Sequence, residues 1–336
     1  MENFKHIQTA HCENGVTVNL LQQQGMDWMN EPLAFGMGSG LFYIHIPFLK
    51  VNGGPAISFR SMPGSIFKRT CKVLNVDVNR KKFSSKEAAQ TYLDEKLDQG
   101  LSVGCQVGVF HLMYFPKEYR FHFNAHNLIV YGKEEDNYLI SDPVMETTTT
   151  LTAPELEKVR FAKGALAPKG HIYYAEKAGI ITEEMIRKGI VKGIKHNVRD
   201  MLHIPARAAG VRGINHTASK VRKWRDQVGE RQAGLFLGQI VRMQEEIGTG
   251  GGGFRFLYAA FLEQAAERLG NDKLIRISEE FTKSGDLWRD SALQMAGIYK
   301  GRITAQKDFD HAADIMNEIA ALEKQAFQDL SKLKLR

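Results

Sequence analysis

The chain has 336 residues, of which 43% are hydrophobic, and it carries a formal net charge of +7. This composition is typical of a soluble globular protein, and the sequence contains no run of 18 or more apolar residues that could span a membrane. The three cysteines form no Cys-x-x-Cys pair and have no histidines at zinc-ligand spacing, which excludes a disulfide framework and a structural zinc site. We therefore expect no bound metal and a reducing, cytoplasmic environment. Residues 1–15 also lack the apolar core of a secretion signal.

The first part of the chain, residues 1–177, mixes helix and strand patterns. A short helix is predicted after Cys12, and the glycine-rich stretch AFGMGSG then runs into the apolar strand LFYIHIPFL. Residues 84–100 show the signals of a capped helix, with serines at its start and Gly100 at its end. After this helix, LSVGCQVGVF is typical of a buried strand, HNLIVYGKEEDNYLIS of a β-hairpin and GHIYYAEK of a closing strand.

From about residue 178 onward, apolar residues recur at helical spacing. TEEMIRKGIVKGIKHNVRDML begins with acidic residues, which favour a helix N-terminus. A glycine loop, GTGGGG, leads into FRFLYAAFLEQAAERLG, and two more amphipathic segments follow. The sequence therefore predicts an α+β domain over residues 1–177 and an all-α domain over residues 178–336, with the break within residues 176–184.

Cys12 stands where the first helix is expected to begin. Backbone N–H groups and the helix dipole at that position favour a thiolate. A thiolate nucleophile works with a general base, which a third group holds in place. The candidate bases are His11, His111, His122 and His126. The other cysteines, Cys71 and Cys105, are predicted to be small buried hydrophobes.

The predicted hairpin favours His126 as the base and Asp142 as the group that orients it. If the turn is centred on Glu134, antiparallel partners have residue numbers that sum to 268, and His126 lies opposite Asp142. Direct cross-strand partners lie about 4.5–5.5 Å apart at Cβ and share one face of the sheet. A slip of one residue would put them on opposite faces. Each of the three residues alone is more often structural, but together they favour a triad of Cys12, His126 and Asp142.

At these residues the sequence resembles papain-like cysteine enzymes, in particular the bacteriocin-leader peptidases. The stretches AHCENG, FGMGSGLFYIH and GGGFRFLYAAFLEQAA resemble, more narrowly, the butirosin biosynthesis protein H family, over nearly the whole chain. This resemblance implies a papain-like domain joined to a helical domain. It also implies acyl transfer, because the founding member moves an aminoacyl group from the phosphopantetheine thioester of an acyl carrier protein to an amine of an aminoglycoside.

The resemblance assigns a role to each residue of the site. It makes Cys12 the nucleophile, His126 the base and Asp142 the orienting acid. Papain-like peptidases place an oxyanion-hole Gln about six positions before the cysteine, where this chain has His6, so Gln8 becomes the oxyanion candidate. No bound cofactor is implied, since the 4'-phosphopantetheine arrives on an acidic acyl carrier protein and the acceptor is a small-molecule amine. The helical domain is expected to cover the acyl intermediate against water and to dock the carrier.

A basic segment from Arg187 to Arg225 contains eleven Lys or Arg residues and one acid, Asp200. Such a segment either binds an anionic partner or is a solvated surface. An acidic carrier protein would suit it, and the residues we expect to bind the carrier are Lys220, Arg222, Lys223 and Arg225. Nucleic acid is disfavoured, because Trp224 is the only aromatic residue of the segment and no nucleic-acid motif is present.

Two glycine motifs are further candidates for binding substrate or carrier. The first contributes Gly38 and Gly40, in a loop that we expect to pass close to the active site. The second contributes Gly251, Arg255 and Tyr258, because glycines before a helix can present N–H groups to a phosphate or carboxylate. The alternative for the second motif is a tight turn between helices with Arg255 in a structural salt bridge. Neither motif matches a nucleotide-binding phosphate loop.

Three classes of function remain open on the sequence. The favoured one is a cysteine-dependent N-acyltransferase of secondary-metabolite biosynthesis. A cysteine peptidase, an amidase or a thioesterase would use the same triad with another substrate or acceptor. A non-enzymatic protein that binds anions or nucleic acid is the weakest alternative. The sequence does not specify the acyl group, the amine, or whether the protein is a monomer or a homodimer.

Overall fold

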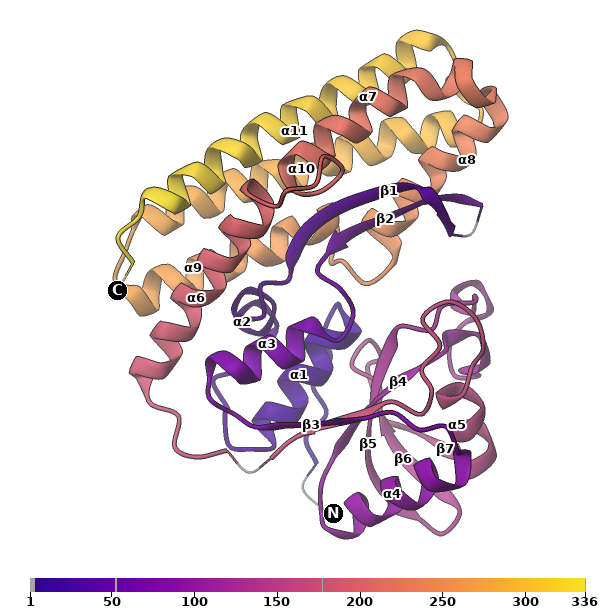
Figure 1. Cartoon of the computed structure of the whole chain (residues 1–336), viewed down its shortest axis with the longest axis vertical. Coiled ribbons are helices and arrows are strands. Elements are labelled where there is room, and N and C mark those ends of the chain that lie inside the picture. Colours follow the sequence, from indigo (N-terminus) through magenta and orange to yellow (C-terminus); the bar gives the residue numbers. More distant parts are fainter. Residues whose placement is uncertain (1–3, 52, 177, 336) are drawn as a thin grey trace. The chain divides into compact units, whose positions relative to one another are not determined.

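The computed structural model describes residues 4–51, 53–176 and 178–335, and the chain divides into two compact units (Figure 1). Unit 1 comprises Met1–Ala34 and Pro63–Thr182, and unit 2 comprises Phe35–Met62 and Glu183–Arg336. The boundary at Thr182 lies within the expected break. Residues 35–62, which the sequence pattern places in the first domain, belong to unit 2, because they pack against helices of that unit.

Unit 1 is built on a six-stranded antiparallel sheet with the strand order β3-β8-β4-β5-β6-β7. The strands are β3 (Val78–Lys81), β4 (Val103–Val107), β5 (His126–Glu134), β6 (Asn137–Ser141), β7 (Thr149–Thr152) and β8 (Ile172–Ala175). The helices are α1 (Cys12–Gln22), α3 (Ser65–Val73), α4 (Lys86–Asp98) and α5 (Ala153–Arg160). Alpha helices therefore combine with an antiparallel sheet in one layered unit, as the α+β prediction requires.

Alternation along the strands gives the sheet two different faces. On one face, Cys105, Leu128 and Ile140 pack into an apolar core with residues of α4 and α5. On the other face lies α1, which contacts β4, β5 and β8 (Figure 1). Residues that alternate with these core residues along the strands, such as Asn127 beside Leu128, therefore point toward α1.

Helix α1 is buried along almost its whole length, from Cys12 to Leu21. Several of its buried polar side chains bond to backbone groups. Glu13 accepts a hydrogen bond from the Ile66 N–H at 2.8 Å, and Asn19 exchanges two bonds of 2.9 Å with the backbone of Ile7. A Cβ at Gly15 would lie 2.3 Å from the Cβ of Pro143, so the helix needs a glycine there to approach the turn after β6. These contacts fix the position of the helix N-terminus.

The capped helix predicted over residues 84–100 is confirmed as α4. The Ser85 side chain accepts a hydrogen bond from the Ala88 N–H at 3.1 Å, which satisfies one of the free donors of the first turn. Gly100 follows the helix with a positive φ of 76°, a conformation that glycine adopts without strain.

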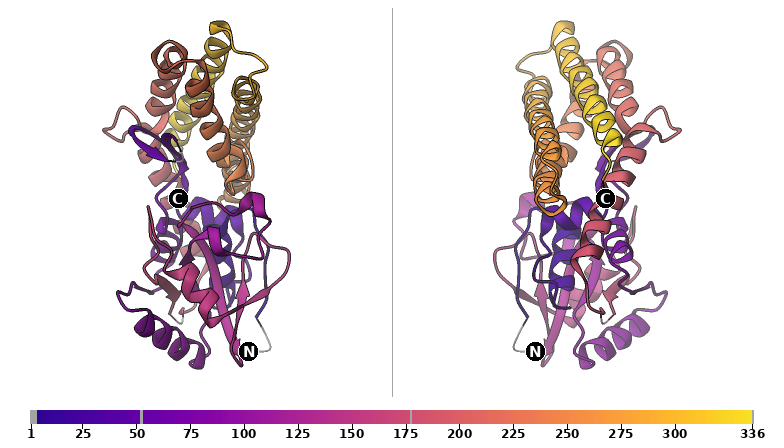
Figure 2. Two further views of the ribbon diagram at one scale, coloured as in Figure 1. Left: turned by 90° about the vertical axis from the view of Figure 1, so that its right-hand side faces the viewer. Right: turned by 90° about the vertical axis from the view of Figure 1, so that its left-hand side faces the viewer.

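Unit 2 is mainly helical, as predicted. Its helices are α6 (Glu183–Leu202), α7 (Gly210–Val228), α8 (Glu230–Val241), α9 (Arg255–Leu269), α10 (Lys273–Tyr299) and α11 (Gln306–Lys332). The long helices α7, α10 and α11 run alongside one another (Figure 1 and Figure 2). A two-stranded hairpin of β1 (Leu41–Val51) and β2 (Gly54–Arg60) packs on α7 and α8, and α2 (Glu31–Met37) spans the point where the chain leaves unit 1. Within the described residues, no helix has both the length and the apolar character needed to cross a bilayer.

Candidate active site

Cys12 is the first residue of α1, at the helix N-terminus predicted from the sequence. The turn before it is held by the carboxylate of Glu31, which accepts hydrogen bonds of 2.9 Å from the N–H groups of Ala10 and His11. His11 is the N-cap residue, and its Nδ1 accepts from the Asn14 N–H at 3.3 Å. This ring nitrogen thus caps the helix. His11 therefore has a structural role and is not the general base.

His126 and Asp142 meet, as the sequence predicts. The Nε2 atom of His126 lies 2.7 Å from Oδ2 of Asp142, and both side chains are buried. Oδ2 also accepts a hydrogen bond of 2.8 Å from the hydroxyl of Tyr114, and Oδ1 accepts from the Val144 N–H at 3.3 Å. Because Nε2 of His126 is hydrogen-bonded to the Asp142 carboxylate, the other ring nitrogen, Nδ1, is the one available to the Cys12 thiol.

The pKa of His126 is strongly perturbed. Burial alone would lower it, but the charges and hydrogen bonds of Asp142 and Cys12 raise it from 6.5 to about 10. At neutral pH the ring therefore carries a proton between a carboxylate and a sulfur. An imidazolium in that place favours a thiolate on Cys12. The Phe115 ring packs T-shaped against the imidazole, with the two ring centroids 5.3 Å apart, and closes one side of the pair.

The register of the hairpin differs from the prediction. Its turn is centred between Glu135 and Asp136, and partners near the turn, such as Lys133 and Tyr138, have numbers that sum to 271. An odd sum would place His126 and Asp142 on opposite faces. A register shift between Val130 and Gly132 changes the sum to 270 for the rest of the ladder, which restores the even parity that the two side chains need. The assumed centre at Glu134 was wrong, but the error left the parity of the pair unchanged.

Asn127 and Tyr114 are two polar residues of the site that the sequence analysis missed. The amide Nδ2 of Asn127 lies 3.8 Å from Sγ of Cys12, and its Oδ1 accepts a hydrogen bond of 2.8 Å from the hydroxyl of Tyr173. Asn127 follows His126 directly in sequence, and this adjacency was the signal available. Tyr114 lies in the loop between β4 and β5, where no local pattern marks it.

The triad lies within the part of the chain that one family model matches. Residues 11–143 match the model described as Butirosin biosynthesis protein H, N-terminal. Residues 154–330, more than half of the chain, match the model described as Domain of unknown function (DUF4872). The chain belongs to the butirosin biosynthesis protein H family. The resemblance to this family inferred from the sequence is thereby confirmed, and the observed fold, a domain of helices and an antiparallel sheet followed by a helical region, agrees with the predicted α+β and all-α parts.

The chain is also similar to solved structures. A putative C39-like peptidase from Bacillus anthracis is similar at 13% sequence identity and a TM-score of 0.37, over 54% of this chain and 98% of that chain. No curated protein matches the sequence. The geometry of the site itself, a thiol with an imidazole and a carboxylate, is that of a cysteine enzyme able to catalyse acyl transfer or peptide hydrolysis.

The remaining candidates of unit 1 have different surroundings. Gln8 is exposed, in the extended segment before α1, and its role as an oxyanion donor stays a prediction. His6, at the position where peptidases carry the Gln, contacts the Ser141 hydroxyl at 2.7 Å and the Met145 carbonyl at 3.0 Å. His111 and His122 lie in the loop between β4 and β5, where His122 stacks on Phe110. Cys71 and Cys105 are fully buried, and burial raises the pKa of their thiols to about 12 and about 11.

Gly38 and Gly40 are buried in unit 2, after the end of α2. The Gly40 N–H donates a hydrogen bond to the Phe35 carbonyl at 2.8 Å, and a Cβ at Gly40 would lie 2.3 Å from the Phe35 ring. The structure therefore corrects the expectation that Gly40 binds substrate, because this glycine allows an aromatic ring to pack against the backbone. Gly38 shares this buried turn.

The second glycine motif is also structural. The Gly252 N–H donates to the carboxylate of Glu245 at 3.1 Å, and the Gly251 N–H donates to the Thr249 hydroxyl at 3.0 Å. The loop thus binds a carboxylate, as its N–H groups predict, but the chain supplies that carboxylate itself. A Cβ at Gly251 would lie 2.7 Å from the guanidinium of Arg289, so the loop is closely packed.

Arg255 and Tyr258 belong to the core of unit 2. Arg255 is fully buried and forms a two-point ion pair with Glu323, at 2.8 and 3.0 Å, while its Nη1 donates to the Gly253 carbonyl. The indole N–H of Trp288 also donates to Glu323. Tyr258 is fully buried, with its ring edge-on to an aromatic neighbour. The expectation that these two residues bind substrate or carrier is wrong, because their polar groups lie inside a packed helical core.

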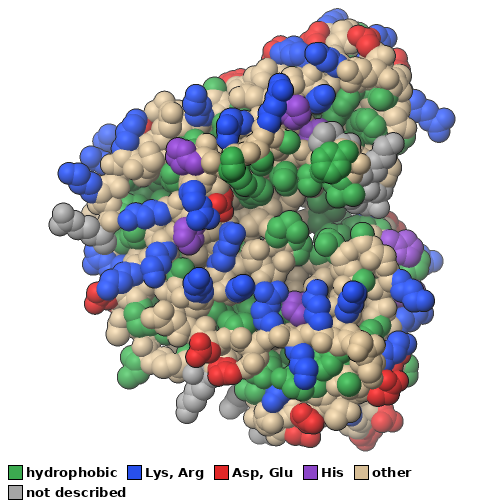
Figure 3. Space-filling view, viewed as in Figure 1, with side chains coloured by type: hydrophobic (Ala, Val, Ile, Leu, Met, Phe, Trp, Pro, Cys, Tyr) green, Lys and Arg blue, Asp and Glu red, His purple; other side chains and the backbone are tan. Residues whose placement is uncertain are grey.

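The basic segment occupies α6, α7 and the loop between them. Acids from outside the segment compensate some of its charge, since Arg222 contacts Asp310 and Asp314 of α11 and Arg225 lies 3.8 Å from Glu230. Lys223 is exposed and Lys220 is half-buried. On α6, Lys192 and Lys195 are exposed. Figure 3 shows Lys and Arg side chains spread widely over the viewed face, with Asp and Glu side chains in fewer places.

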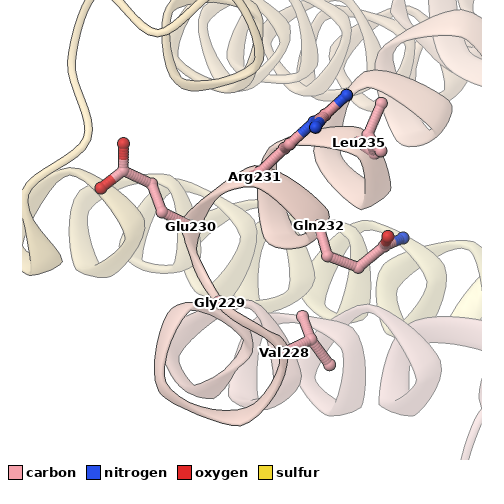
Figure 4. Close-up of a pocket in the computed structure, with 6 residues that line it drawn as sticks. All are labelled: Val228, Gly229, Glu230, Arg231, Gln232 and Leu235. Carbon is pink, nitrogen blue, oxygen red and sulfur yellow. The ribbon is translucent and has the colours of Figure 1, made fainter.

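A shallow hollow of about 490 Å³ lies at the corner between α7 and α8 (Figure 4). It is lined by Val228, Gly229, Glu230, Arg231, Gln232 and Leu235. This lining contains no thiol or imidazole, so it offers no nucleophile of the kind found at Cys12. Among the residues that the structure describes, no three His, Cys, Asp or Glu side chains come together in a way that could hold a metal ion.

Proposed function

We propose that this protein is a cysteine-dependent N-acyltransferase of secondary-metabolite biosynthesis. It takes an acyl group from the phosphopantetheine thioester of an acidic acyl carrier protein and passes it to an amine. The observation that carries this proposal is the buried pair of His126 and Asp142, 2.7 Å apart, beside Cys12 at the N-terminus of α1. The family, whose N-terminal model is named for butirosin biosynthesis, supports a biosynthetic role over a degradative one.

The first half-reaction uses the ion pair as it stands. The Cys12 thiolate attacks the thioester carbonyl, and N–H groups at the start of α1 stabilise the developing oxyanion. When the tetrahedral intermediate collapses, the bond to the pantetheine sulfur breaks and His126 gives its proton to that sulfur. The products are acyl-Cys12, a neutral imidazole and a free pantetheine thiol.

The second half-reaction reverses the proton transfer. The neutral His126 accepts a proton from the incoming amine as its nitrogen attacks the acyl-Cys12 carbonyl. The new C–N bond forms, the C–S bond breaks, and the thiolate and imidazolium are restored. Exchange between two thioesters is nearly balanced in free energy, so formation of the amide drives the sequence forward. Burial of the triad supports an amine as acceptor over water, because Cys12 is 7% exposed and His126 is 5% exposed.

The exposed lysines of α6 and α7 support an acidic carrier as the acyl donor. Complementary charge speeds encounter and is screened by salt. We expect Lys192→Glu combined with Lys195→Glu to slow transfer from the carrier and to leave transfer from a small N-acetylcysteamine thioester unchanged. Lys300→Glu, an exposed change after α10, is the matched control. Equal losses with both donors would contradict docking at this surface.

The test of the function is a discharge experiment. Wild-type protein is acylated from a carrier thioester, separated from the donor, and incubated with or without a panel of amines. A transferase predicts an amide product and loss of the adduct that depends on amine concentration, while Cys12→Ala gives neither. Discharge at one rate with and without amine would indicate a thioesterase, and cleavage of a peptide by the same thiol would indicate a peptidase. Either result would overturn the proposal.

A further inference from the structure

Asn127 touches the reacting sulfur from the sheet side. It is 4% exposed and directly follows His126 on β5. Its Nδ2 donates to the Ala125 carbonyl at 3.1 Å and points at Sγ of Cys12 at 3.8 Å. A buried primary amide has two N–H bonds, so the second one is available to the sulfur.

The orientation of the Asn127 amide is determined by its neighbours. A carbonyl oxygen can only accept, so Ala125 requires an N–H at the Nδ2 position. The Tyr173 hydroxyl donates to Oδ1 at 2.8 Å on the other side. Burial first, and then the nearby charges of Glu13 and Cys12, raise the pKa of Tyr173 well above 10, so this donor keeps its proton.

The position of Tyr173 is itself built into the sheet. Tyr173 pairs with Gly104 across strands β8 and β4, and a Cβ at Gly104 would lie 2.5 Å from the tyrosine ring. The missing side chain therefore lets the ring lie over β4 and reach Asn127. Gly104, Tyr173 and Asn127 form a connected support that ends at the thiol.

We propose that Asn127 is a further catalytic residue, which donates an N–H bond to the Cys12 thiolate and increases the thiolate population at neutral pH. The assignment rests on the proposed role of Cys12 as nucleophile. The two neighbours of the sulfur then have separate tasks. His126 exchanges the proton, and Asn127, which has no proton to give up in this pH range, stabilises the negative charge. The chain lacks a Gln six positions before the cysteine, and Asn127 brings a side-chain amide to the thiol from another part of the fold.

The test is the pH profile of Cys12 alkylation. Purified full-length protein is treated with iodoacetamide between pH 5 and 10, and labelling at Cys12 is followed by peptide mass spectrometry. Loss of a hydrogen bond to a charged group shifts a titration midpoint by roughly one pH unit. Asn127→Ala should therefore move the midpoint of Cys12 alkylation upward by about one unit. Asn127→Asp should move it further, because a carboxylate repels the thiolate. Tyr173→Phe should give a smaller shift in the same direction.

The controls separate this role from a structural one. Asn137→Ala, an exposed asparagine of the same hairpin, should leave the midpoint unchanged. If Asn127→Ala does not fold, Asn127→Asp keeps the shape of the side chain, and Tyr173→Phe leaves Asn127 in place. Folded Asn127 variants with the wild-type midpoint would overturn the proposal, even if their activity were reduced.

The same protein preparations distinguish this proposal from the proposed function. Suppose that the wild-type protein forms no acyl-Cys12 from any thioester but that the Asn127 variants shift the alkylation midpoint. This result would contradict the proposed transferase activity and support the role of Asn127. If acyl-Cys12 forms normally but the Asn127 variants leave the alkylation midpoint unchanged, only the proposed role of Asn127 is contradicted.

Discussion

Replacing Asp142 by Asn is the sharpest perturbation of the ion pair at the active site. The carboxylate accepts from His126 at 2.7 Å and is fully buried, so no solvent replaces it. Without its charge, burial dominates and the pKa of His126 falls from about 10. The Asn amide can also donate to Nε2 and so stabilise the wrong tautomer of the ring.

The size of the effect follows from the hydrogen bond that is lost. A bond between a charged donor and acceptor contributes about 1.5–3 kcal/mol, which corresponds to roughly a 10- to 100-fold change in the population of the ion pair. We therefore expect Cys12 of Asp142→Asn to be alkylated roughly 10- to 100-fold more slowly at pH 7. The preference for anionic iodoacetate over neutral iodoacetamide should also fall, because the adjacent imidazolium is lost.

The matched control is Asp136→Asn, an exposed change in the turn of the same hairpin, which should leave both rates unchanged. Circular dichroism establishes that the variants are folded. Alkylation of a folded Asp142→Asn protein at the wild-type rate, with the same preference for iodoacetate, would refute the assignment of Asp142 as the group that holds the His126 proton.

Three further predictions concern stability, each measured by urea unfolding. Because the pKa of His126 is raised from 6.5 to about 10, its protonation stabilises the fold fully below about pH 6.5, and this contribution is lost as the pH rises toward 10. The unfolding free energy should fall over this window in the wild type and less in His126→Gln, and equal slopes would count against the shift. Gly252→Ala should destabilise by about 1–3 kcal/mol, because its φ is 56° and the new Cβ would lie 2.9 Å from backbone. Gly270→Ala, with a φ of 62° and open space around it, should cost less, and a reversed order would contradict the packing. Arg255→Met should cost about 3–5 kcal/mol by leaving Glu323 buried without its partner, and the double change with Glu323→Leu should recover part of this loss. A single variant as stable as the wild type would show that the pair contributes nothing.

Much of the site could be predicted because its signals are local. Cys12 was placed at a helix start by the pattern around it, and the hairpin with His126 and Asp142 at its open end followed from two apolar runs and a polar turn. The pairing of the two side chains depended on parity, however, and parity depended on a bulge next to Gly132 that no local pattern reveals.

The parts that could not be predicted depend on contacts between distant segments. The Asn127 amide faces Cys12 because Tyr173, 46 positions away, holds it there. In the glycine loop, the sequence indicates N–H groups that bind an anion, but it cannot show that Glu245 of the same chain is that anion. Arg255 was similarly ambiguous, since a buried ion pair and a ligand-binding guanidinium have the same local sequence.

The most direct test of the transferase is intact-mass spectrometry of the protein after mixing with acylated carrier proteins. Acyl transfer through Cys12 predicts a mass increase equal to one acyl group, located at Cys12 by peptide mapping, absent in Cys12→Ala and present in Cys105→Ser. Addition of the acceptor amine should remove the adduct and yield the amide. If the Cys12→Ala variant turned over the thioester as well as the wild type, or if the acyl group were found on another residue, Cys12 would not be the nucleophile.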